Sequence, residues 1–230
     1  MSEVYLIDFV VILIILIPAL VAFNRGFVKT AMGFLPVPVA IFCSYKFTPA
    51  ISEFVRGTSF YENLRTKIMS SLALEEIISK NANQTDIINS IRLPEFLKTS
   101  LLENNNSVVH EILDVSGIKE YISGFLANIC INVLVVILIF IAVLLIGKIV
   151  LSLLDLFAKL PVISFFNRTA GLLVGILQGL VIVWLLGLIV TYFFYRPEYA
   201  DFFNQLYQTK VASYLYENNM LLFLVLKIFT

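Results

Sequence analysis

The sequence predicts an all-α polytopic membrane protein with four transmembrane helices in two hairpins, joined and followed by amphipathic helices. Of its 230 residues, 60% are hydrophobic and only 14% are charged, whereas a soluble domain carries about a quarter charged residues. Two stretches of 27 residues each contain no charge, and about 20 mostly apolar residues suffice to cross the hydrocarbon layer. Lys and Arg also gather in two short connections, as they do in turns on the cytoplasmic side of a membrane.

The first hairpin is predicted over residues 1–47. Its helices, Val4–Phe23 and Phe27–Phe47, each have a charge-free core of only 16 residues. At 1.5 Å per residue, such a core covers about 24 Å. Asp8 and Lys29 should therefore lie near the headgroups, or these helices should be thin and kinked.

The central segment, residues 48–120, differs in kind because it carries seven basic and ten acidic residues. Apolar residues recur in it at helical spacing, as in the stretch YENLRTKIMSSLALEEIISK, which predicts two to four amphipathic helices. We interpret these helices as a solvated extracytoplasmic cap that joins the two membrane hairpins. A domain that binds a ligand or partner is the alternative, since apolar helix faces also form interfaces.

The second hairpin is predicted over residues 121–195, and its helices contain the uncharged stretches Tyr121–Gly147 and Thr169–Tyr195. Between them, the amphipathic stretch 149–160 should lie along the inner membrane surface. The tail, residues 196–230, resumes helical periodicity. Its apolar end is shorter than a span and should lie in the outer interface or re-enter the membrane slightly.

Lys and Arg in short loops set the orientation of the helices. The first turn carries Arg25 and Lys29, and the connection between the last two helices carries Lys148, Lys159 and Arg168. Both connections should therefore be cytoplasmic, which places the N-terminus, the central segment and the C-terminus outside.

The tripeptide Phe-Asn-Arg occurs twice, ending at Arg25 and at Arg168, each time just before the second helix of a hairpin. Both Arg side chains can reach anionic headgroups, and the preceding Asn24 and Asn167 suit the helix N-cap. We favour a pair of positively charged membrane anchors. A substrate site is the alternative.

Glycines recur at multiples of four residues along the fourth predicted helix and line one face of it: Gly171, Gly175, Gly179 and Gly187. The second helix carries a weaker version of the pattern at Gly26, Thr30 and Gly33. Missing side chains let another backbone approach closely, which is a main source of helix contact in lipid. We therefore expect the second and fourth helices to be central and to face each other, or the stripe to meet another copy of the chain.

Few polar residues fall within the spans. The amides of Asn128, Asn132 and Gln178 should form hydrogen bonds between helices, because an unpaired polar group in hydrocarbon is costly. A polar substrate path is the alternative. Asp8 should cap the first helix at the outer surface, and a buried, proton-carrying carboxylate is the other interpretation.

The sequence shows no constellation typical of catalysis, metal binding or cofactor binding. It has one His, His110, and two cysteines, Cys43 and Cys130, both within predicted spans, and nothing with the spacing of a metal site. No basic patch with interleaved aromatic residues stands outside the spans, which argues against nucleic-acid binding. We expect a non-enzymatic protein without a cofactor.

Two stretches resemble the colicin V production protein (CvpA) family. The first, LIDFVVILIILIPALVAFNRGFVKTAMGFL, has Asp8 at the mouth of a helix and an Arg25-Gly26-Phe27 turn followed by Lys29. The second, FNRTAGLLVGILQGLVI, has Asn167-Arg168 before the glycine pattern. The resemblance implies a bacterial inner-membrane protein linked to the production or export of a peptide toxin and to envelope robustness. The long central segment and extended tail depart from the short members of that family.

Two functional hypotheses remain open. The first is a CvpA-like integral membrane protein that supports peptide-toxin production or secretion and envelope integrity, packing through its glycine stripe with itself or with a transport partner. The second is a small transporter or channel with a polar path between the helices, lined by Asp8, Arg25, Asn128, Asn132, Arg168 and Gln178.

Overall fold

The computed structural model describes residues 2–72, 74, 77–78, 83–91, 93–154 and 164–226, and every regular element in these ranges is helical. Four of the described helical stretches are long and apolar enough to cross a membrane: Tyr5–Arg25, Phe27–Arg56, Ile118–Leu151 and Phe166–Tyr192. The predicted fold class, an all-α polytopic membrane protein, is confirmed.

The spans correspond to five helices, because the second span is broken. They are α1 (Ser2–Arg25), α2 (Phe27–Phe34), α3 (Pro36–Arg56), α9 (Ile118–Leu154) and α10 (Ser164–Tyr192). The break falls at Leu35, directly before Pro36, since proline has no N–H to continue α2 and is well suited to start a helix. Ile149–Leu154, the described part of the expected interfacial helix 149–160, continues α9, and the rest of that helix lies outside the described residues.

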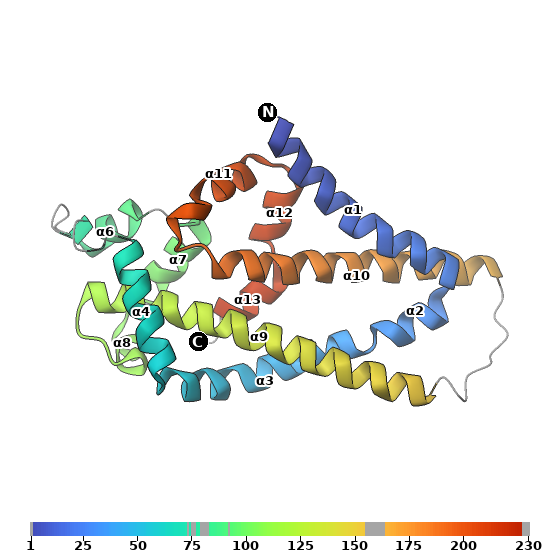
Figure 1. Cartoon of the computed structure of the whole chain (residues 1–230), viewed down its shortest axis with the longest axis horizontal. Coiled ribbons are helices and arrows are strands. Elements are labelled where there is room, and N and C mark those ends of the chain that lie inside the picture. The colour runs from blue at the N-terminus through green and yellow to red at the C-terminus, as the bar shows by residue number, and fades with distance from the viewer. Residues whose placement is uncertain are drawn as a thin grey trace.

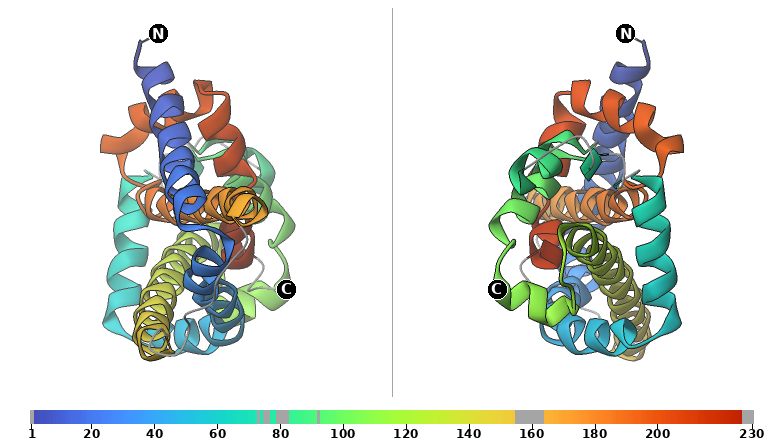
Figure 2. Two further views of the ribbon diagram at one scale, coloured as in Figure 1. Left: turned by 90° about the vertical axis from the view of Figure 1, so that its right-hand side faces the viewer. Right: turned by 90° about the vertical axis from the view of Figure 1, so that its left-hand side faces the viewer.

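The long helices pair in an interleaved order (Figure 1). The first span packs against the fourth, as α1 on α10, and α3 packs against α9. The corner between α1 and α2 and the facing ends of α9 and α10 lie at the same end of the molecule (Figure 1). Viewed along the long axis, α1 and α3 lie on opposite sides of α10 (Figure 2).

The central segment forms a helical cap at the other end of the bundle. Its described helices are α4 (Ser59–Ser71), α6 (Gln84–Ser90), α7 (Glu95–Glu103) and α8 (Ser107–Leu113). Thirteen consecutive residues of α9, Tyr121–Val133, are buried where this helix enters the cap. The hydroxyl of Tyr121 donates to the carbonyl of Leu101 at 2.6 Å, so α7 and α9 are joined by a hydrogen bond as well as by apolar contact.

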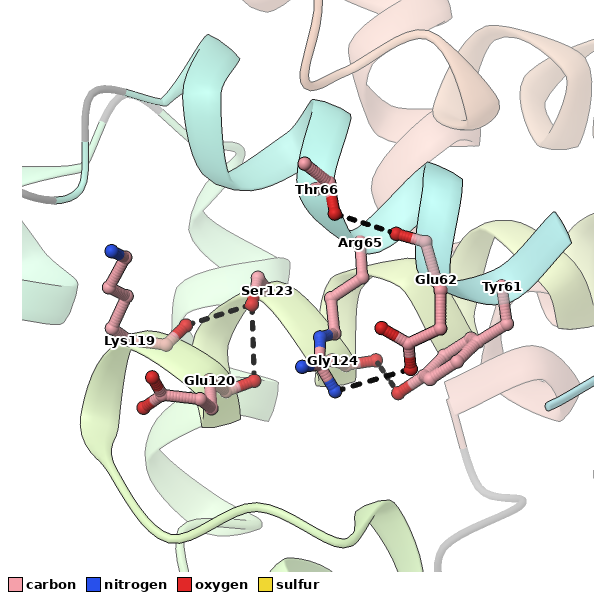
Figure 3. Close-up of polar contacts among 8 residues, drawn as sticks. All are labelled: Tyr61, Glu62, Arg65, Thr66, Lys119, Glu120, Ser123 and Gly124. Atoms are coloured by element: carbon pink, nitrogen blue, oxygen red, sulfur yellow. Dashed lines mark hydrogen bonds and ion pairs between the residues drawn. The ribbon is translucent and has the colours of Figure 1, made fainter. Parts of the chain in front are cut away.

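A second set of polar contacts joins α4 to α9 (Figure 3). The hydroxyl of Tyr61 donates to the carbonyl of Gly124 at 3.3 Å, and Arg65 on the same face of α4 pairs with Glu62 at 3.5 Å. Burial raises the pKa of Tyr61, so its hydroxyl keeps the proton that it donates. Ser123 bonds to the carbonyls of its own helix, one turn back. The cap and the membrane helices therefore form one packed unit.

The tail folds back onto the bundle. It contains the short 3₁₀ turn η1 (Pro197–Tyr199) and the helices α11 (Ala200–Gln208), α12 (Val211–Glu217) and α13 (Met220–Leu226). As α1 and α10 diverge, α11 and α12 lie between them (Figure 1). α13 packs against α9 and α10.

Candidate functional site

The two copies of Phe-Asn-Arg meet at the corner between α1 and α2. Asn167, in the first turns of α10, accepts a hydrogen bond from the backbone N–H of Val28 through Oδ1 at 3.2 Å. Gly26 turns the chain with a positive φ of 82°, and a Cβ there would collide with the Asn167 amide. Gly26 is therefore required both for its backbone conformation and for the space it leaves.

The predicted N-cap roles of Asn24 and Asn167 are wrong. Asn24 lies inside α1, and the residue before α2 is Gly26, which has no side chain to cap a helix. Asn167 lies inside α10, which begins at Ser164. Because Gly26 brings the first turn of α2 against α10, Asn167 caps α2 from a different helix.

The basic side chains of this corner point outward. Arg25, Lys29 and Arg168 are all exposed and lie at the end of the molecule where both connections between spans are found (Figure 1). This position suits side chains that reach headgroup phosphates.

The glycine stripe packs against α1. A Cβ at Gly171, Gly175 or Gly179 would come within 2.5–2.6 Å of α1 atoms, namely the carbonyl oxygen of Ala22, the Cα of Ala19 and the Cα of Ile15 respectively. The expected partner, the second helix, does pack against α10, but the nearest neighbours of the stripe lie on α1, and the first residue of α2 is among them only at Gly171. The small residues Ala19 and Ala22, both buried, give α1 the complementary face.

The remaining predicted packing glycines behave differently. Gly187 faces the tail, because a Cβ there would lie 2.8 Å from Nδ2 of Asn219. Gly33 is exposed and has open space around its α-carbon. The weaker pattern in the second helix is therefore not a continuous packing face.

Asp8 caps a helix that lies about 200 residues later in the chain. Its Oδ1 accepts from the N–H groups of Val211 and Ala212 at 3.0 and 2.8 Å, and its Oδ2 accepts from that of Lys210 at 3.1 Å. These are the first donors of α12, which have no partner within their own helix. The predicted role as the cap of the first helix is wrong, because α1 begins at Ser2 and contains Asp8.

Asn219 joins α13 to α10. Its Nδ2 donates to the carbonyl of Trp184 at 2.9 Å, and its Oδ1 accepts from the N–H groups of Leu221 and Leu222 at the start of α13. Two turns further along α10, the hydroxyls of Thr191 and Tyr216 lie 3.0 Å apart. Sequence reasoning named none of these residues, although an Asn directly before an apolar run is a recognisable cap signal.

The two Asn residues of the third span form the expected hydrogen bonds between helices. Asn128 Oδ1 accepts from the guanidinium of Arg56 at 2.8 Å, and Asn132 Nδ2 donates to the carbonyl of Val225 in α13 at 3.2 Å. Both Asn residues are fully buried. Arg56 was not predicted as a site residue, because its position at the end of the second span shows only in the structure.

The six polar residues proposed to line one transport path lie in separate places. Asp8 binds α12, whereas Arg25 is 17 residues further along α1, about 25 Å away. Arg25 and Arg168 lie at the corner, Asn128 and Asn132 lie on α9, and Gln178 is half-buried on α10.

An open hollow of about 800 Å³ lies between the cap and the α10–α11 connection. Apolar and polar side chains both line it, among them Pro94, Arg196, Phe203 and Tyr207. Burial raises the pKa of Tyr207, and the guanidinium of Arg196 lies 5.6 Å from the ring centroid of Phe193. Within the described ranges, no group of three or more His, Cys, Asp and Glu residues is placed to hold a metal ion.

Fold and junctions together define a polytopic α-helical membrane protein whose helices are capped by side chains from other helices. Residues 7–80 and 109–219 match the family model described as colicin V production protein. The chain belongs to this family. The unmatched residues between the two stretches include α6 and α7 of the cap. No curated protein and no solved structure matches the chain.

Proposed function

We propose that this chain is a non-enzymatic protein of the bacterial cytoplasmic membrane that supports the production or secretion of a peptide toxin and the integrity of the envelope. Membership of the colicin V production protein family supports this role. The distribution of Lys and Arg supports an orientation in which the corner with Arg25 and Arg168 is cytoplasmic, and both termini and the cap are outside.

The single observation that carries the proposal is that the residues on which the family resemblance rests make contacts that build the bundle. The glycine stripe meets α1, Asn167 caps α2 and Asp8 caps α12, all within one chain. These residues therefore hold a scaffold together, and none of them is arranged around a reacting group. A transport partner would therefore bind a different surface. The exposed polar surfaces available for this are the cap and the basic corner.

A small transporter or channel is the second candidate function. It is favoured by polar side-chain atoms of α3 and α9 that are buried without a hydrogen-bond partner among the described residues. Uncompensated polar groups inside a membrane bundle often mark an ion or substrate route.

The proposed role is tested in a bacterial strain that lacks the gene and secretes a peptide toxin. Restoring the wild-type chain should restore toxin release and resistance to detergent, and Gly175→Leu should restore neither, because the α1–α10 contact is lost. Leu173→Ala, on the exposed face of α10, is the matched control and should behave as wild type. If loss of the gene changes neither toxin release nor detergent resistance, the proposal is wrong.

A further inference from the structure

A row of small polar side chains runs along the buried face of α3. Ser44, Thr48 and Ser52 follow one another at four-residue spacing, so they lie on one side of the helix, and each is at most 1% exposed. α3 packs mainly against α9. We call these three residues, with Asn128 and Asn132 of α9, the polar seam.

The antiparallel register of the two helices determines which residues of α3 and α9 lie at the same depth. At one end, a Cβ on Gly147 of α9 would lie 2.6 Å from the Cβ of Pro36. At the other end, Arg56 holds Asn128. Ser52 is one turn before Arg56 and Asn132 is one turn after Asn128, so Ser52 and Asn132 lie at the same depth.

Five atoms of the polar seam are buried and have no hydrogen-bond partner among the described residues. They are Ser44 Oγ, Thr48 Oγ1, Ser52 Oγ, Asn128 Nδ2 and Asn132 Oδ1. Helical hydroxyls commonly bond to the carbonyl one turn back, as Thr30 and Thr191 do at 2.8 Å. The seam hydroxyls make no such bond, and an orphaned polar group in an apolar interior costs free energy.

We infer that the polar seam binds a file of water molecules that enters from the Arg56 end. Residues one helical turn apart have Cβ atoms about 5–6 Å apart. One water molecule that makes two hydrogen bonds of about 2.8 Å covers the same distance, so it can bridge two successive side chains of the seam. A water beside α9 accepts from Asn128 Nδ2 and donates to Asn132 Oδ1. Hydroxyls on α3 serve as donor and acceptor alike.

The charges and donors at the seam favour water over an ion. The guanidinium of Arg56 at the entrance repels a cation, and the amide N–H of Asn128 offers a cation no ligand. The Asn132 carbonyl oxygen and the absence of further positive charge on the seam residues disfavour an anion. Water satisfies the donors and the acceptors together.

The file reaches more than halfway across the membrane. Ser44 is twelve residues from Arg56, which corresponds to about 18 Å along α3, whereas the hydrocarbon layer is about 30 Å thick. Arg56 is the last residue of the membrane-length stretch Phe27–Arg56, so it lies at the end of that span. In the proposed orientation this entrance opens to the outside.

Cysteine labelling in proteoliposomes tests the inference. The native thiols are first removed with Cys43→Ala and Cys130→Ala, and single cysteines are then introduced as Ser44→Cys, Thr48→Cys and Ser52→Cys. A small, water-soluble methanethiosulfonate reacts with the thiolate, which forms only where water reaches the sulfur. Phe47→Cys, next to Thr48 but at a position that is 55% exposed within the membrane-length stretch Phe27–Arg56, is the matched control.

We expect each seam cysteine to react about tenfold faster than the Phe47→Cys control, or more, with rates falling from Ser52→Cys to Ser44→Cys. Seam cysteines that react no faster than the control would overturn the inference, and so would labelling that sodium or potassium ions block. Each variant is first checked for unchanged gel-filtration behaviour.

A second measurement uses the unmodified chain, in case the substitutions disturb folding. Hydroxyl radicals generated by X-ray radiolysis of bound water should oxidise Phe140, a buried side chain at the depth of Ser44 in the same register. A Phe140 that remains unoxidised would contradict the water file. Neither measurement depends on toxin secretion, so the proposed function and the water file can fail separately.

Discussion

Two helix pairs carry the bundle, and both use small residues at four-residue spacing, yet their chemistry differs. In the α1–α10 pair, Gly171 and Gly175 lie against Ala22 and Ala19, and Gly179 lies against the backbone of Ile15, so the atoms nearest to the stripe are backbone and methyl groups. In the α3–α9 pair, the small residues carry hydroxyls and face amides, and five polar atoms lack a partner in the described part of the chain. The same spacing thus gives one contact that needs only close packing and one that also needs a polar occupant.

The largest expected effect is in the α1–α10 pair. Gly175→Leu places a side chain where the Cα of Ala19 and the carbonyl of Pro18 lie 2.6 Å from the Cβ position. Overpacking of this kind costs about 1–3 kcal/mol or more, and backbone cannot move aside as a side chain can. Thermal unfolding in detergent should show a much lower unfolding temperature for this variant and an almost unchanged one for the exposed Leu173→Ala. Equal tolerance of the two would contradict the packing.

Loss of the Asp8 cap should have the next largest effect. Asp8→Ala leaves three N–H donors at the start of α12 without their acceptor, which costs about 1–2 kcal/mol. The tail should become sensitive to limited proteolysis, while Asp201→Ala, an exposed acid on α11, should leave the cleavage pattern unchanged. A tail equally resistant in both variants would contradict the cap.

The repeated tripeptide provides its own control for a smaller effect. Asn167→Ala removes the acceptor of the Val28 N–H and should reduce the free energy of unfolding by about 1 kcal/mol. Asn24→Ala changes the matching residue of the other copy, which is exposed within α1, and should be nearly neutral. The comparison fails if the two alanine variants unfold at the same temperature.

The smallest effect on stability is expected in the α3–α9 pair. Thr48→Val keeps the shape of the side chain and removes one hydroxyl of the polar seam, which should change the free energy of unfolding by less than about 1 kcal/mol. In a chain that also carries Ser44→Cys, the same change should slow cysteine labelling, because the water file is interrupted. Unchanged labelling would mean that water reaches Ser44 by another path.

Composition and periodicity were enough to predict the four spans, the helices of the central segment and the gathering of both tripeptides at one end, although the second span continues to Arg56, beyond its predicted end at Phe47. A long charge-free stretch must lie in lipid whichever helix it packs against. The presence of each span therefore follows from the sequence alone. Which helix meets which does not follow. Val28 and Asn167 are 139 residues apart, and Asp8 and Ala212 are 204 apart, so no local pattern contains these partners.

The polar seam was within reach of sequence reasoning but was not recognised. Ser44, Thr48 and Ser52 have the same four-residue spacing as the glycines of α10. Their significance depends on the packing of α3 against α9. That pairing is a property of the packed bundle and does not show in the pattern of apolar residues.

A single comparison of cysteine reactivity tests the difference between the two helix pairs most directly. Ala22→Cys lies in the α1–α10 contact and Ser52→Cys in the α3–α9 contact, at parent positions that are 1% and 0% exposed. In a chain without Cys43 and Cys130, the water-soluble methanethiosulfonate should label Ser52→Cys and leave Ala22→Cys unreacted. Equal labelling of the two, or faster labelling of Ala22→Cys, would contradict a dry contact beside a hydrated one.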